Sequence, residues 1–140
     1  MTLSRLLSLT LGLIGCAGAA PASQGTAPPA ATTPAAPAAT VRNVDVATLK
    51  ADLDRGAVPL LIDVRTPEEF AGGHVPAARN VPLDALDARL AELGTGEVYV
   101  ICQSGGRSAR ASTALAAKGL HPVNVTGGTG AWKAAGYPVE

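Results

Sequence analysis

Apolar positions along the chain alternate between short continuous runs and stripes at helical spacing. Two continuous runs, Val58–Val64 and Glu97–Ile101, are typical of strands buried on both faces. Shorter runs predict further strands at Val41–Val44, Arg79–Val81 and Pro122–Val125. The stretches between them predict helices over Asp45–Arg55, from Thr66 onward, over Leu83–Leu93, over Arg107–Lys118 and over Gly128–Ala135. Strands that alternate with helices predict an α/β fold with a mostly parallel central sheet flanked by helices.

Local end signals support two of these helices. Asp45 can cap the first helix, because its side chain can accept a hydrogen bond from the first turn. Thr66, followed by Pro67 and by Glu69 three residues after the cap, forms a capping-box pattern with proline at the first helical position. We therefore expect both helices to begin where these signals stand.

The first 40 residues differ from the rest of the chain in composition. Residues 1–16 have the pattern of a secretory signal peptide, because Arg5 precedes an apolar run that is too short to span a bilayer. Residues 17–40 are rich in Ala, Pro, Thr and Gly and carry no charge, so we expect a disordered linker. This leaves residues 41–140 as one domain of ordinary size.

The signal ends in Leu13-Ile14-Gly15-Cys16, which resembles the lipobox of bacterial lipoproteins. The resemblance implies that Cys16 is lipidated and anchors the protein to a membrane. We therefore expect export to the periplasmic side of the bacterial envelope. The alternative is ordinary signal cleavage after Ala19 or Ala20, which would release a soluble periplasmic protein.

Charge and cysteine content narrow the functional classes. Residues 41–140 contain eleven acidic and ten basic side chains, a balance that gives no support to nucleic-acid binding. Between Val98 and Val139 the only charged side chains are cationic. Cys102 lies in this segment, and the chain's other cysteine is Cys16, so we expect no disulfide within the domain.

Cys102 follows directly after a predicted buried strand and precedes a predicted helix. In parallel α/β sheets, sites lie beyond the carboxyl ends of strands. A glycine-bearing turn that leads into a helix directs backbone N–H groups toward an anion and lowers the pKa of a thiol placed there. We therefore expect Cys102 to be a nucleophile held in an anion-binding loop. The other loop residues are Gln103, Ser104, Gly105, Gly106, Arg107 and Ser108.

Several loop residues are expected to act on the Cys102 sulfur or on a bound anion. Gly105 and Gly106 are expected to adopt positive φ and bring the amides close to the sulfur. The Ser104 and Ser108 hydroxyls are expected to donate hydrogen bonds to it. Arg107 is poorly placed at a helix N-terminus unless it binds an anion.

Four stretches of the domain, taken together, resemble the single-domain rhodaneses, which are sulfurtransferases. They are Leu61–Phe70, Gly73–Asn80, Cys102–Ser108 and Gly127–Trp132, and they occur in the family's order. One departure is Ala77, where the family often has glycine. The resemblance implies that Cys102 takes a sulfane sulfur from a donor such as thiosulfate, holds it as a persulfide and passes it to cyanide or a thiol. It implies small-molecule partners and no cofactor, and we expect a monomer.

Other side chains near the loop are assigned supporting roles. Asp63 closes the neighbouring predicted strand and Arg65 follows it, and we expect the pair to lock loops together, with a direct part in chemistry as the alternative. His74 has no metal-ligand spacing around it, so no metal site is expected. Trp132 and Phe70 are interpreted as packing residues.

Two other functions remain open at this stage. The first is a non-catalytic rhodanese-like binding module, although such domains typically lack the cysteine that this chain keeps. The second is a phosphatase or arsenate reductase that uses the same loop. Only four residues separate Cys102 from Arg107, whereas related phosphatases have one more, and the shorter loop argues against phosphate.

Overall fold

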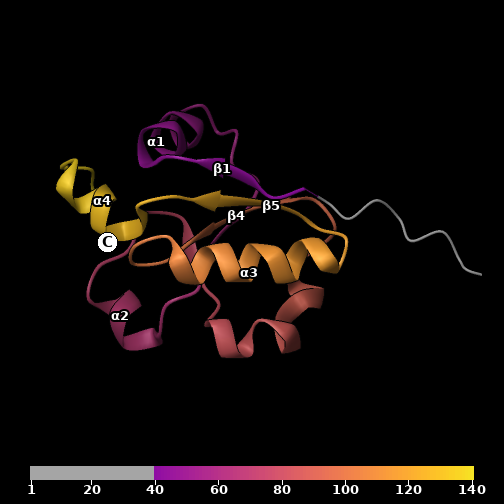
Figure 1. Ribbon diagram of the computed structural model, residues 1–140. Helices are drawn as coiled ribbons and strands as arrows, with labels where there is room; N and C mark the ends of the chain where they lie inside the picture. Colours follow the sequence, from indigo (N-terminus) through magenta and orange to yellow (C-terminus); the bar gives the residue numbers. More distant parts are fainter. Residues whose placement is uncertain (1–39) are drawn as a thin grey trace, which may run out of the picture. The chain divides into compact units, whose positions relative to one another are not determined.

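A computed structural model describes residues 40–140 of the chain (Figure 1). The predicted signal segment, Cys16 and the linker up to residue 39 lie outside the described residues. Within the described part, no helix is both long enough and apolar enough to cross a membrane.

The domain is built on one five-stranded sheet with the strand order β1-β5-β4-β2-β3. Every neighbouring pair is parallel, which confirms the predicted α/β fold with a parallel sheet. Strand β4 lies at the centre, between β5 and β2, so its carboxyl end is flanked by loops on both sides. The strands span Arg42–Val44 (β1), Leu61–Asp63 (β2), Ala78–Asn80 (β3), Glu97–Ile101 (β4) and His121–Val125 (β5).

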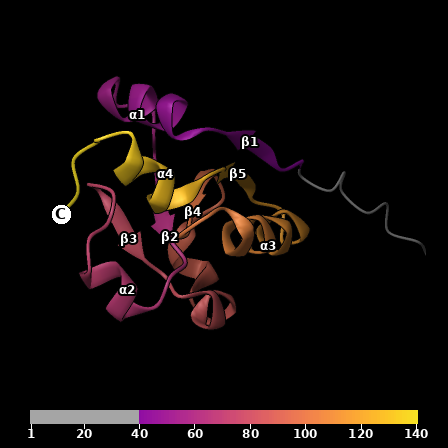
Figure 2. The same cartoon turned by 60° about the vertical axis from the view of Figure 1, so that its left-hand side comes forward.

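Helices cover both faces of the sheet (Figures 1 and 2). Helices α1 (Val46–Asp54) and α4 (Gly128–Ala134) pack over one face, where Leu49, Tyr99 and Trp132 belong to a buried apolar cluster. Helix α3 (Gly106–Ala117) lies on the other face, above a cluster that includes Val100, Cys102 and Leu115. Helix α2 (Pro67–Ala71) follows β2 directly and lies near the carboxyl ends of the strands.

The two predicted helix starts are confirmed. The Asp45 side chain accepts a hydrogen bond from the Thr48 backbone N–H at 2.7 Å. At α2 the Thr66 hydroxyl accepts from the Glu69 N–H, and the Glu69 carboxylate accepts from the Thr66 N–H. Each cap satisfies a donor that the helix itself leaves free, which fixes where the helix begins.

The prediction of one continuous helix over Leu83–Leu93 is wrong in kind. The segment forms two 3₁₀ helices, η1 (Leu83–Ala85) and η2 (Asp87–Leu93), whose starts carry no side-chain cap. The apolar stripe Leu83, Leu86, Leu90 and Leu93 is spaced by three, four and three residues. This spacing averages about 3.3 residues, between the 3.6 of an α-helix and the 3.0 of a 3₁₀ helix, so it does not distinguish the two. The strand expected from Val58 also starts later, at Leu61, because Pro59 has no N–H for the sheet.

Candidate active site

Cys102 lies immediately after the central strand β4, at the carboxyl edge of the sheet. Its side chain is only 1% exposed, and its Sγ atom accepts a hydrogen bond from the Gly105 backbone N–H at 3.1 Å. Gly105 adopts φ = 103°, which turns the chain back over the sulfur before α3 begins at Gly106. Gly106 itself is helical, so the expectation of a positive φ at this second glycine is wrong.

Opposing influences act on the Cys102 thiol. Burial raises its pKa, because burial disfavours the thiolate. Hydrogen bonds from the Ser108 hydroxyl and from the backbone N–H groups of Ser108, Ser104 and Gly105 outweigh burial, and the pKa lies below its usual value. Ser104 therefore contributes to this effect through its backbone, whereas a hydroxyl contact was expected. The loop favours the thiolate, which is the nucleophilic form of cysteine.

Ser108 is fully buried beneath the loop. Its hydroxyl oxygen lies 3.0 Å from the Gly105 carbonyl oxygen and 2.7 Å from Oδ1 of Asn124 on β5. Sequence reasoning did not identify Asn124. Its position in β5 on the face below α3 could have identified it, because a buried amide on an apolar face must find polar partners.

Arg107 forms a two-armed ion pair with Glu69 of α2. The Nη1 and Nη2 atoms lie 2.6 and 2.7 Å from the two Glu69 carboxylate oxygens. The Arg107 hydrogen bonds lower the pKa of Glu69 to about 2, so this carboxylate is ionised throughout the neutral range. Sequence analysis recognised Glu69 only as part of a helix cap. The contact arises because β2 and β4 are adjacent and parallel, so the segments after their ends meet.

Asp63 and Arg65 form a buried ion pair at the end of β2, with exposed fractions of 0% and 2%. The Arg65 guanidinium also donates to the Gly73 carbonyl at 3.1 Å and to Oε1 of Gln103 at 3.4 Å. The pair thus ties the β2 end to the 72–74 turn and to the Cys102 loop. These contacts match the predicted locking role and place neither side chain on the sulfur.

The start of α4 holds the same loop from the other side. The Thr129 N–H donates to the Cys102 carbonyl at 2.8 Å, and the Gly130 N–H donates to the Gln103 carbonyl at 2.9 Å. A Cβ atom at Gly128 would lie 2.2 Å from the Cys102 carbonyl oxygen. Only glycine fits at position 128, because any side chain would collide with the backbone of the Cys102 loop.

A hollow of about 440 Å³ lies beside Arg107. Its lining combines apolar side chains with two cations and one carboxylate. The lining residues are Val64, Thr66, Pro82, Leu83, Asp84, Arg107 and Arg110. This hollow offers room for a small molecule next to the loop arginine.

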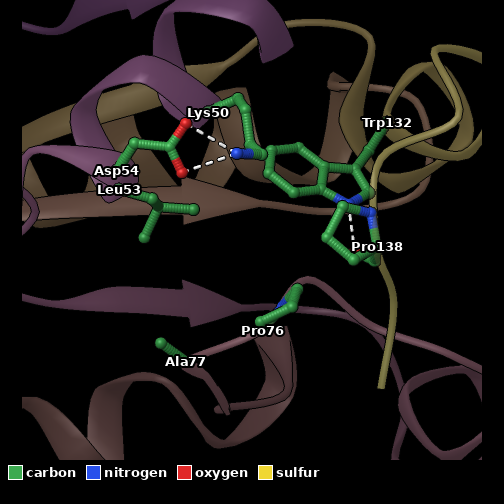
Figure 3. Close-up of a pocket in the computed structure, with 7 residues that line it drawn as sticks. All are labelled: Lys50, Leu53, Asp54, Pro76, Ala77, Trp132 and Pro138. Atoms are coloured by element: carbon green, nitrogen blue, oxygen red, sulfur yellow. Dashed lines mark hydrogen bonds and ion pairs between the residues drawn. The ribbon is translucent and has the colours of Figure 1, made fainter.

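A second hollow, of about 250 Å³, is lined by residues of α1, α4 and the turn before β3, and Cys102 is not among them (Figure 3). Lys50 and Asp54 pair at its edge. Trp132 is 1% exposed and donates from Nε1 to the Pro138 carbonyl at 2.7 Å. This supports the packing role assigned to Trp132, because its indole is enclosed by the protein.

His74 packs within the domain. Its ring stacks on Phe70 with centroids 3.6 Å apart, and its Nδ1 lies 3.1 Å from the Phe70 carbonyl oxygen. Across residues 40–140, no group of three or more His, Cys, Asp or Glu side chains could hold a metal ion.

The fold and the site define an α/β protein with a cysteine in a glycine-bearing loop at the end of its central strand, where a backbone N–H points at the sulfur. The profile of the Rhodanese-like domain family matches residues 45–135, and the chain belongs to this family.

Three individual proteins illustrate the likeness. The uncharacterized protein YqhL of Bacillus subtilis is 46% identical over 74 residues, which are 51% of this chain and 59% of YqhL. A protein named sulfurtransferase from Allochromatium vinosum is 35% identical over 71% of this chain and 94% of its own length. The crystal structure of a rhodanese-related protein from Thermoplasma volcanium matches with a TM-score of 0.66 and 34% identity, over 71% of this chain and 97% of that one.

Proposed function

We propose that this protein is a sulfurtransferase that moves a sulfane sulfur from a donor such as thiosulfate, through a persulfide on Cys102, to a thiophilic acceptor. One observation carries the proposal: the Cys102 sulfur accepts the Gly105 N–H at the start of α3, with Arg107 in the same loop. The membership in the rhodanese-like family and the name of the Allochromatium vinosum relative support it.

In the first half-reaction the Cys102 thiolate attacks the outer sulfur of thiosulfate. A new sulfur–sulfur bond forms on Cys102, and the bond between the two donor sulfurs breaks. Sulfite leaves with the electron pair of the broken bond, so no general base is needed. The loop N–H groups and the Arg107 guanidinium stabilise the negative charge on the incoming and departing anions.

In the second half-reaction the acceptor attacks the outer sulfur of the persulfide. Cyanide becomes thiocyanate, or a thiolate becomes a persulfide, and the Cys102 thiolate is restored. Cys102 is the only cysteine among residues 40–140, so no neighbouring thiol in the described domain can take the sulfur. The acceptor therefore comes from outside the described domain, as cyanide, a small thiol or a partner protein. The hollow beside Arg107 and Arg110 has room for a small molecule next to the loop.

The cellular setting proposed from the sequence is the periplasmic side of the bacterial envelope, with Cys16 lipidated and the domain acting as a monomer. The mass of the mature N-terminal peptide tests the anchor. A diacylglyceryl group on Cys16 would support the anchor. A free N-terminus after Ala19 or Ala20 would instead indicate ordinary signal cleavage and a soluble periplasmic protein.

Intact-mass measurement after incubation with thiosulfate tests the chemistry directly. We expect a gain of one sulfur atom on Cys102, its loss on adding cyanide with release of thiocyanate, and neither event in Cys102→Ala. A domain that gains no sulfur from any sulfane donor would be assigned to the binding modules. Turnover of an aryl phosphate without sulfur transfer would assign it to the phosphatases.

A further inference from the structure

Asn124 stands out among the residues that the reaction does not use. It lies within β5, paired in register with Val100 of β4, and is 4% exposed. Its neighbours Val123 and Val125 are buried in the cluster under α1 and α4, so Asn124 faces the opposite, α3 side of the sheet. Burying an amide on that apolar face costs free energy unless both of its ends are hydrogen-bonded.

Both ends are hydrogen-bonded. Asn124 Oδ1 accepts from the Ser108 hydroxyl at 2.7 Å, and Asn124 Nδ2 donates to Asn43 Oδ1 at 2.8 Å. Asn43 lies on the edge strand β1 and is exposed. A continuous line of hydrogen bonds therefore runs from the protein surface to the residue beside the reactive sulfur.

The Ser108 hydroxyl has one proton, and its hydrogen-bond partners in the structure are Gly105 O and Asn124 Oδ1. The Cys102 sulfur competes with them for that proton, because the Ser108 hydroxyl lowers the pKa of the thiol. When the sulfur is a neutral thiol, the amide and carbonyl oxygens are the better acceptors. When the sulfur carries negative charge, it becomes the strongest of the three. The Gly105 carbonyl keeps the Ala109 N–H in either case, whereas Asn124 Oδ1 would lose its donor.

An asparagine can meet this demand by turning its side-chain amide. The turn places Nδ2 against the Ser108 oxygen and Oδ1 against Asn43, and the exposed Asn43 amide can turn to donate in its place. The same contacts are then made with donors and acceptors exchanged. We propose that Asn124 is a positioning residue, which turns its amide to direct the Ser108 proton toward the Cys102 sulfur whenever that sulfur is negatively charged.

The inference deepens the proposed function, but its test needs no sulfur donor. Asn43→Asp keeps the shape of the side chain and makes it a pure acceptor. The new carboxylate would hold Asn124 Nδ2, keep Asn124 Oδ1 facing Ser108 and withhold the proton from the sulfur. We expect the pKa of Cys102 to rise by about 0.5, with about threefold slower alkylation by iodoacetamide at neutral pH. Asn43→Ala leaves Asn124 free to turn and should not slow alkylation.

Removing one link of the Asn43–Asn124–Ser108 hydrogen bonds separates the effect of a fixed Asn124 amide from a direct effect of the new charge. In an Asn124→Leu background, Asn43→Asp should leave the alkylation rate unchanged, and Ser108→Ala provides a second background if Asn124→Leu fails to fold. The other charged groups around the loop, Asp63, Arg65, Glu69 and Arg107, are identical in every variant.

Alkylation is read at the Cys102 peptide by mass spectrometry, so Cys16 does not contribute. A normal rate in Asn43→Asp would overturn the proposal, as would the same slowing when Asn124 or Ser108 has been removed. Neither result bears on whether Cys102 carries sulfur, which the mass measurement with thiosulfate decides separately.

Discussion

Arg107 and Glu69 hold each other at the mouth of the Cys102 loop through two hydrogen bonds of 2.6 and 2.7 Å. Arg107 was expected to bind an anionic ligand, but in the structure it is already paired with the Glu69 carboxylate. Both side chains remain about one-third exposed, at 36% and 35%, so water screens the pair and its strength is modest. An anionic donor that uses Arg107 must compete with Glu69 for it.

Glu69→Gln should therefore tighten donor binding. Glutamine keeps the capping box that starts α2, but it removes the charge that competes for Arg107. We expect the KM for thiosulfate to fall by a factor of about 1.4 to 5, the range given by an exposed ion pair of about 0.2–1 kcal/mol.

Glu68→Gln is the matched control for charge removal, because Glu68 lies in the same turn of α2 and forms no ion pair with Arg107. Its KM should stay close to that of the unaltered protein. A rise in KM in Glu69→Gln would mean that Glu69 orients Arg107 for the donor and does not compete with it.

The pH dependence of sulfur uptake should follow Cys102 alone. The thiolate is the reactive form, so the rate falls as pH drops through the pKa of Cys102, which lies below the usual value for a thiol. The pKa of Glu69 is depressed to about 2, so its pair with Arg107 stays intact until strongly acidic pH and adds no second step above pH 5. A rate profile with one ionisation is the expected result.

Ser108→Ala should move that ionisation to higher pH. The Ser108 hydroxyl is the side chain whose hydrogen bond lowers the pKa of Cys102, so its removal leaves burial less opposed. Ultraviolet titration of the thiolate, with Cys102→Ala subtracted, gives the midpoint. An unchanged midpoint in Ser108→Ala would show that the backbone N–H groups suffice.

Gly128→Ala should disrupt the site, because its Cβ would lie 2.2 Å from the Cys102 carbonyl oxygen and must displace the loop. Gly119→Ala is the matched control: it has a positive φ of 84°, but nothing lies within 4 Å of its added Cβ. Both changes carry the backbone cost of alanine at positive φ, about 1–2 kcal/mol. Only Gly128→Ala should lose thiosulfate turnover, by at least tenfold, while the protein remains folded. Equal loss in both variants would argue against steric displacement of the loop.

Sequence patterns predicted the features whose causes are local. Asp45 and Thr66 cap helices through neighbours three residues away, and Cys102 ends a continuous apolar strand, so each signal is contained in a short window. The contacts of Glu69 and Asn124 join residues 38 and 16 positions apart in the chain. Such contacts depend on which strands become neighbours in the sheet, and the hydrophobic pattern does not specify strand order.

The 3₁₀ segment and the Gly105–Gly106 pair show a further limit. A leucine stripe indicates that a segment is helical and which side is buried, but its spacing left the type of helix unresolved. Two adjacent glycines indicate a tight turn, yet only Gly105 takes the left-handed conformation, while Gly106 begins α3. Local composition therefore predicted where the loop lies, but it did not predict which of the two glycines makes the turn.

Ala77 is the non-glycine residue with positive φ, at 67°, among the described residues. It is the position at which the sequence departs from the family's frequent glycine, and alanine in this conformation costs about 1–2 kcal/mol. Ala77→Gly removes that cost, but glycine loses more conformational entropy on folding, which offsets the gain by about 0.5–1 kcal/mol. We expect a net gain of about 0.5–1 kcal/mol in the free energy of unfolding, measured by urea denaturation. Ala114→Gly, at an exposed position in α3, makes the same chemical change and should lose about 1 kcal/mol. If both substitutions destabilise the protein alike, the strain assigned to Ala77 is absent.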